Sequence, residues 1–177
     1  MSMSEALAEA YASAPADELV LETIELHHPG FIDEFGSLVS IRLVQSFEDH
    51  TLGLENTAPL NPSEMVLFKA LAFEFTPTGF GEGEVPSIQL SVSNVSRIIT
   101  KYLEQASQYT DPITLIYRPY LESDPSEPQI DPVVIMTITS VESGVMAVTG
   151  TASLSDVHNW PFPNKKYTPE AYPGLVR

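Results

Sequence analysis

The chain has 177 residues, 43% of them hydrophobic, a net charge of −16 at pH 7 and no cysteine. This size fits one domain with a buried core, and the absence of cysteine excludes disulfides, thiolate zinc sites, iron–sulfur ligation and a cysteine nucleophile. An acidic chain repels phosphate backbones, so no specific nucleic-acid binding is expected, and no apolar run approaches the length needed for membrane insertion.

The N-terminus predicts a short helical arm. Ser2 and Glu5 have the spacing of a capping box, and Pro15 ends the helical pattern. These N-terminal residues lack the basic start and the long apolar core of a signal peptide, so no signal peptide is expected. We therefore expect a helical arm over residues 1–17 that is unpaired within its own chain and available for contacts with a neighbouring subunit.

Alternating apolar and polar residues predict most of the remaining chain to be strand. Glu142-Ser143-Gly144 separates two such runs and indicates a hairpin. The polar, Pro- and Gly-containing segments 46–63, 76–84 and 122–132 are predicted to be loops, the first with at most a weak strand. The strands are expected at residues 18–28, 38–45, 65–75, 88–92, 113–121, 133–141 and 145–154. In the strand 65–75, the odd-numbered apolar residues are expected on one side: Met65, Leu67, Leu71, Phe73 and Phe75.

Between Val85 and Leu103 the apolar period changes from two to about 3.6. Ser93-Asn94 lies at the change and is a good N-cap pair, so a strand is expected to lead into an amphipathic helix at about 94–108. These residues carry no reactive group and are predicted to pack in the core. The predicted core residues are Ile88, Leu90, Val92, Val95, Ile98, Ile99, Tyr102 and Leu103.

Together these elements predict a mainly β (α+β) fold. Nearly every strand pair can be antiparallel, so we expect an antiparallel β-barrel or a two-sheet sandwich with one packed amphipathic helix. The chain is interpreted as a single domain, 1–177. It comprises the arm 1–17, a core 18–154 and a Pro-rich tail 155–177.

Candidate chemistry is sparse. His27 and His28 are adjacent and point to opposite faces of a strand, so a strand-end turn explains them better than a metal site. The pairs Asp33-Glu34 and Glu48-Asp49 are expected to be solvated surface, and the glycines of residues 79–83 do not open a helix as a phosphate loop would. We predict no catalytic, cofactor-binding or metal-binding residues.

Arg118 interrupts an apolar strand between two tyrosines. One reading is a stacked or salt-bridged arginine at a sheet edge, and a compatible one is a contact between subunits. The Pro-rich tail must lie against its own domain or a neighbour. The possible interface residues are therefore Arg118, Tyr120, Trp160 and Phe162.

The order of several short motifs resembles a family of phage and prophage tail proteins of unknown function. The motifs are Phe73-Glu74-Phe75, Val92-Ser93-Asn94-Val95, Tyr117-Arg118, Ser153-Leu154-Ser155-Asp156 and Phe162-Pro163. The chain is also similar, more distantly, to the N-terminal hub part of the minor tail protein L family of long-tailed phages. Residues 65–177 carry the resemblance and residues 1–64 hardly do. These 177 residues contain no cysteine, so neither the Cys-bearing C-terminal domain of that family nor its iron–sulfur cluster is carried over to them.

The resemblance implies a tail-tube- or hub-like structural component of a phage tail tip or baseplate, not an enzyme. It would join the tail tube to distal tail proteins, as a hub or distal ring adaptor, in a homo-oligomeric ring of three or six copies. It would be found in the virion, and in the host cytoplasm during assembly. DNA would pass through the lumen of this ring. Residues 1–64 carry twelve acidic side chains and one basic side chain. This charge is typical of a surface that keeps a protein soluble, and it would also suit a face that docks on a basic partner or a wall of the lumen.

Two other functions remain open. The first is a hydrolase or a carbohydrate-binding module that uses the acidic loops, and the second is a cellular acidic adaptor protein outside any virion.

Overall fold

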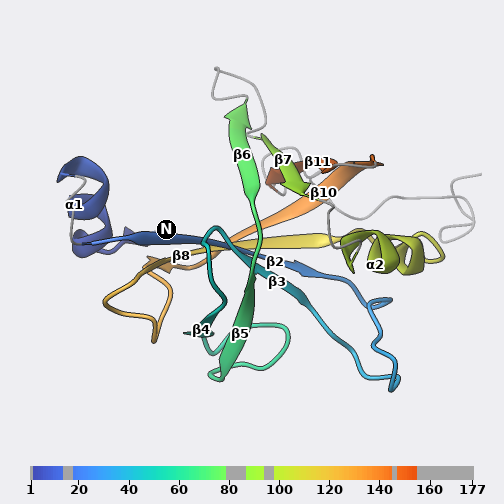
Figure 1. Ribbon diagram of the computed structural model, residues 1–177, viewed down its shortest axis with the longest axis horizontal. Coiled ribbons are helices and arrows are strands. Elements are labelled where there is room, and N and C mark those ends of the chain that lie inside the picture. Colours follow the sequence, from blue (N-terminus) through green and yellow to red (C-terminus); the bar gives the residue numbers. More distant parts are fainter. Residues whose placement is uncertain (1, 14–17, 79–86, 94–97, 145–146, 155–177) are drawn as a thin grey trace, which may run out of the picture.

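The computed structural model describes residues 2–13, 18–78, 87–93, 98–144 and 147–154 (Figure 1). Nine strands form one strongly twisted sheet in the order β4-β5-β3-β2-β8-β10-β11-β7-β6, and β1 pairs with β9 apart from it. None of the helices described is long and apolar enough to cross a membrane. The strands are β1 Ser2–Met3, β2 Val20–His27, β3 Ile41–Val44, β4 His50–Gly53, β5 Met65–Ala70, β6 Phe73–Thr78, β7 Ser87–Ser93, β8 Thr114–Leu121, β9 Ile130–Asp131, β10 Val134–Ser143 and β11 Ala147–Leu154, and the helices are α1 Glu5–Ser13 and α2 Ile98–Ala106.

The predicted mainly β fold with a packed helix is confirmed, as is the hairpin of β10 and β11. One strand pair departs from the expected antiparallel arrangement, because β3 and β5 run parallel. Strand β4, in the segment where a weak strand was expected at most, lies between them in sequence. It pairs antiparallel with β5 and so reverses the chain direction.

The sheet is not closed into a barrel, and it does not split into the two sheets of a sandwich. Strands β5 and β6 follow one another nearly in line, yet each pairs toward a different end of the sheet (Figure 1). The two residues between them join those ends. The Leu71 N–H donates to the Val44 carbonyl on β3, and the Ala72 carbonyl accepts from the Ser93 N–H on β7. The sheet therefore curls around a single main core.

This main core lies between the inner face of the curled sheet and α2. Of the predicted core residues, Leu90, Val92 and Ile99 are buried in it. Ile88, Tyr102 and Leu103 are partly buried and pack against it. Val95 and the side chain of Ile98 lie outside the part of the chain that the structure describes. The main core contains Ile24, Leu26, Phe31, Ile41, Leu43, Phe73, Leu90, Val92, Ile99, Ala106, Leu115, Met136, Val148 and Ala152.

A second apolar core occupies the opposite face of β2, β3 and β8. It is covered by residues 53–64, which we call the strap. The second core explains why the facing predicted for the strand 65–75 is wrong. The odd-numbered residues of that strand were expected to face a single core. Phe68 is fully buried in the second core, whereas Met65 and Leu67 are about half exposed. The second core contains Leu21, Val44, Leu52, Leu54, Ala58, Phe68 and Tyr120.

The N-terminal arm packs on its own chain, so the expectation of an unpaired segment is wrong. Strand β1 pairs antiparallel with β9, and Leu7 on α1 is fully buried against Leu121. The Ser4 hydroxyl accepts a hydrogen bond from the Leu7 N–H at 3.1 Å, which caps the helix. The arm therefore extends the fold at the end of the sheet opposite α2 (Figure 1).

Candidate functional site

Among the described residues, the largest concentration of buried charge surrounds Arg118 on β8. Its Nε and Nη2 atoms donate to the two carboxylate oxygens of Glu55 at 2.7 and 2.8 Å. Its Nη1 atom donates to Glu25 Oε2 at 2.6 Å. The side chains of Arg118 and Glu25 have no exposed surface, and that of Glu55 is only 16% exposed. The bidentate geometry with Glu55 is the strong form of an arginine–carboxylate pair.

The same network holds the strap against the sheet. Arg42 on β3 faces Glu25 at 3.3 Å and donates through Nη2 to the Leu60 carbonyl and to Asn61 Oδ1. The Tyr120 hydroxyl donates to the Gly53 carbonyl at 2.7 Å. Two arginines and one tyrosine of the sheet thus bind the start and the far end of the strap.

Burial by itself would lower the pKa of Arg118, but the hydrogen bonds that Arg118 donates to Glu55 and the negative charges of Glu25 and Glu55 outweigh it and raise the pKa. The guanidinium is therefore permanently charged, and its donors are directed at carboxylates. Such a network fixes the position of the strap against the sheet.

Arg118 is salt-bridged, as one reading of the sequence expected, but it does not lie at a sheet edge, because β8 runs between β2 and β10. Arg118 and Tyr120 are both fully buried, so neither side chain has surface left to contact another subunit in this fold. The reason is the strap, which covers what would otherwise be an exposed sheet face. Trp160 and Phe162 lie outside the described residues.

A second polar cluster attaches α1 to the sheet. The hydroxyls of Tyr11 and Tyr117 both donate to the carboxylate of Glu22 on β2. Burial, followed by the hydrogen bond to Glu22, raises the pKa of Tyr11 to about 12. Burial and the charge of Glu22 also raise the pKa of Tyr117. Both phenols must stay protonated for this attachment to persist.

The cluster predicts a specific loss of stability in alkali. Because the pKa of Tyr11 is raised from 10.0 to about 12 on folding, its contribution is complete below pH 10 and is lost as the pH rises toward 12. We expect Tyr11→Phe to flatten the fall in unfolding free energy across this range. Urea unfolding at a series of pH values measures it, and Tyr109→Phe, on a half-exposed tyrosine beyond α2, is the control. Parallel curves for wild type and Tyr11→Phe would contradict the assignment.

The histidine and carboxylate pairs have structural roles. His28 is fully buried after β2, where its Nε2 atom donates to the Asp111 carbonyl and its Nδ1 atom accepts from the Gly30 N–H. Asp49 accepts from Lys69 Nζ and from the Ala70 N–H. Within the described ranges no three His, Asp or Glu side chains gather as metal ligands would. Residues 79–83 lie outside those ranges.

The loop between β2 and β3 presents a fully exposed aromatic residue that sequence reasoning missed. Phe35 is 91% exposed at its tip, and Asp33 Oδ1 fixes the turn by accepting from the N–H groups of Phe35 and Ser37 at 2.8 Å each. Gly36 has φ +81°, a conformation that glycine adopts without strain. The Asp-x-Phe-Gly pattern was the available signal.

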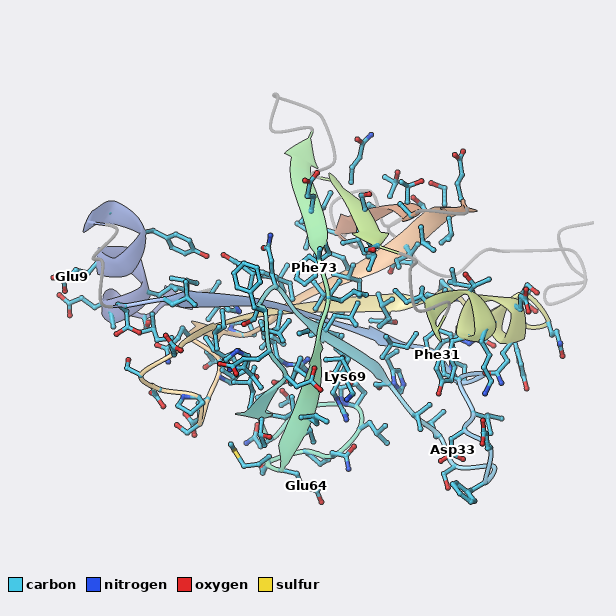
Figure 2. The ribbon with its side chains drawn as sticks, viewed as in Figure 1. Glu9, Phe31, Asp33, Glu64, Lys69 and Phe73 are labelled. Carbon is cyan, nitrogen blue, oxygen red and sulfur yellow. The ribbon has the colours of Figure 1, made fainter. Side chains whose placement is uncertain are left out.

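This loop is also tied to α2. The Gln105 side chain accepts from the Ile32 N–H and donates to the Ile32 carbonyl, and the Phe31 ring packs on that of Tyr102 with centroids 5.5 Å apart. Figure 2 shows Phe31 beside α2 and Asp33 farther out, in a loop that extends away from the sheet. Phe35 is therefore an exposed apolar side chain on a well-anchored support.

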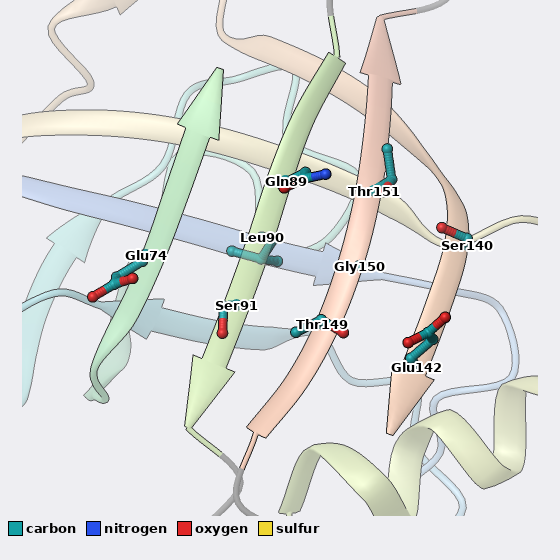
Figure 3. A pocket seen from close by; sticks show the side chains of 9 residues that line it. All are labelled: Glu74, Gln89, Leu90, Ser91, Ser140, Glu142, Thr149, Gly150 and Thr151. Carbon is teal, nitrogen blue, oxygen red and sulfur yellow. The ribbon is translucent and has the colours of Figure 1, made fainter. Parts of the chain in front are cut away.

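A polar groove of about 430 Å³ crosses the outer face of β6, β7, β11 and β10 (Figure 3). Glu74 on β6 and Glu142 on β10 lie on its two sides. Side chains with hydroxyl or amide groups lie between them, including Gln89, Ser91 and Thr149. A bulge in β10 between Ile138 and Ser140 bends this strand beside the groove.

Residues 6–167 match the family described as a domain of unknown function, DUF1833. The chain belongs to this family. No curated protein matches the chain. The DUF1833 match includes α1, α2 and the whole curled sheet. The strap, the Phe35 loop and the polar groove are therefore all parts of the DUF1833 domain.

Proposed function

We propose that this DUF1833 protein is a structural component of a phage tail tip or baseplate, where it forms a ring of three or six copies between the tail tube and distal tail proteins. The observation that carries the proposal is Phe35, a large apolar side chain held almost fully exposed by an ordered loop. Aromatic residues on rigid supports are typical anchors of protein interfaces.

Three other features support the proposal. The motifs of residues 65–177 resemble phage tail proteins. The mainly β sheet with its packed helix agrees with that resemblance in fold class, although the sheet is not closed into the barrel of a tail tube or hub. Phe47, at the turn between β3 and β4, is a second fully exposed aromatic side chain. The concentrated buried charge around Arg118 fixes the strap, which suits a rigid building block.

The proposal is tested first on assembled particles. Purified tails from a phage that encodes this chain are expected to contain it in mass spectrometry, at three or six copies per tail. Tails that are complete without the chain would contradict the proposal. Cryo-electron microscopy of the tail end would then place the ring.

Replacing Phe35 with aspartate is expected to weaken assembly without unfolding the chain. Loss of an interface anchor costs about 2 kcal/mol or more, roughly a 30-fold rise in the dissociation constant of the ring. The unfolding free energy should stay within about 0.5 kcal/mol of wild type, because the side chain is exposed. Sedimentation velocity measures assembly and urea unfolding measures stability.

Leu67→Asp, half exposed on β5, is the matched control. Equal assembly of the Phe35→Asp variant and wild type would contradict the anchor role.

A carbohydrate-binding module is the second candidate, and the polar groove favours it. Carboxylate, amide and hydroxyl groups on rigid strands can hydrogen-bond the hydroxyls of a saccharide. A saccharide that binds the folded state would raise the melting temperature with its concentration, and Thr149→Arg, inside the groove, would remove the shift. No shift with any of a panel of glycans would exclude this function.

A further inference from the structure

A second groove, of about 500 Å³, lies between α2 and β10 on the helix-covered side of the sheet. Its floor is apolar: Leu103 on α2, Ile113 before β8 and Ile138 on β10 all pack against the main core and also line the groove. Val141 on β10 lines it too and is 38% exposed. This volume falls within the range of roughly 300–1,000 Å³ in which proteins bind small ligands.

The rim of this groove is acidic. Glu104 near the end of α2 and Asp111 after it are both exposed, and the described residues that line the groove include no lysine or arginine. A groove with an apolar floor and carboxylates at its rim is complementary to a peptide segment in which apolar residues are followed by basic residues. An acidic segment would be repelled at this rim.

The chain itself contains such a segment. Trp160-Pro161-Phe162-Pro163 is followed, after Asn164, by Lys165-Lys166, in a chain with only eight basic residues. Its two prolines restrict the unbound segment, which lowers the entropy lost on binding. We propose that residues 160–166 of the same chain bind in the groove between α2 and β10, with the aromatic side chains on its floor and the lysines at its acidic rim.

The position of Leu154 favours binding within one chain. Leu154 ends β11 opposite Met136 on β10, two residues from Ile138, and it packs against the same core as the groove floor. Two strand residues span roughly 7 Å. Trp160 follows Leu154 by six residues, which reach roughly 20 Å when extended. The segment is therefore tethered near the groove at high effective concentration.

Trp160 is the only tryptophan of the chain, so intrinsic fluorescence reports on it directly. In the full-length protein we expect emission at shorter wavelength than that of free tryptophan and weak quenching by acrylamide. Val141→Asp places a charge on the groove and should shift emission toward that of free tryptophan and increase quenching. Ile135→Asp, on the same strand, half exposed and not among the residues lining the groove, should leave both unchanged. Circular dichroism checks that both variants fold.

If Val141→Asp does not fold, the exposed rim provides the second variant. Glu104→Lys with Asp111→Lys should cause the same red shift, more strongly at low salt, because the lost attraction is screened by ions. Emission like that of free tryptophan in the wild type would overturn the proposal. A folded groove variant that leaves blue-shifted emission unchanged would also overturn it.

A cross-link distinguishes one chain from two, since the protein contains no natural cysteine to interfere. Val141→Cys with Phe162→Cys should oxidise to a monomer that migrates faster on a non-reducing gel, and Ile135→Cys with Phe162→Cys should not. Cross-linked dimers in place of monomers would overturn binding within one chain. The result is independent of the proposed phage function, which the composition of purified tails tests.

Discussion

Replacing Arg118 with methionine is expected to lower the unfolding free energy by about 3–5 kcal/mol. The guanidinium makes three hydrogen bonds of 2.6–2.8 Å to Glu25 and Glu55, and its removal leaves two carboxylates facing an apolar side chain. Glu25 keeps Arg42 at 3.3 Å, but Glu55 loses both of the bonds that hold the strap. Urea unfolding measures the loss. Amide hydrogen exchange should show early exposure of strap residues.

Two variants show whether the loss comes from uncompensated buried charge. Lys69→Met breaks the exposed pair with Asp49 and should cost only about 0–1 kcal/mol. Adding Glu55→Gln to Arg118→Met removes one of the orphaned charges and should recover part of the stability. A loss below about 1 kcal/mol for Arg118→Met would show that the network contributes little.

Replacing Ile99 with aspartate is expected to prevent folding. Ile99 is 3% exposed on the face of α2 that packs on the main core, and an ionised carboxylate there would be buried within a cluster of apolar side chains. The expected loss exceeds about 4 kcal/mol, a large part of the 5–15 kcal/mol that stabilises a typical domain. Circular dichroism and solubility measure the outcome.

Graded variants separate charge from lost volume. Ile99→Ala removes the same contacts without a charge and should cost about 2–5 kcal/mol. Lys101→Asp places a carboxylate two residues further along α2, where the side chain is about half exposed, and should cost no more than about 1 kcal/mol. A soluble, cooperatively folding Ile99→Asp protein would mean that α2 does not brace the sheet as described.

Most local elements were predictable because their signal is local. Alternation identified the strands that include Ile24, Leu90 and Leu115, and the change of period after Val92 identified the helix that became α2. The error at Met65 and Leu67 has a long-range cause. In β5 it is Phe68 that is buried, in the second core beneath the strap. Met65 and Leu67 lie at odd-numbered positions of the same strand and are about half exposed.

The candidate site was predictable only in part. Arg118 stood out because a charge in an apolar strand requires a partner. Its partners, however, are 93 and 63 residues away in sequence, so no local pattern identified Glu25 or Glu55. Phe35 was missed because one exposed aromatic side chain leaves no periodic signal.

The sequence alone determined most of the long strands, the helix α2 and the need of Arg118 for a partner, because side-chain periodicity and buried charge act over a few residues. Only the tertiary structure decided the pairing. It placed β3 parallel to β5, curled the sheet by joining β3 to β7 through Leu71-Ala72, and covered its outer face with the strap. These pairings depend on contacts between segments that are distant in sequence, so they cannot be predicted from any short stretch of the chain.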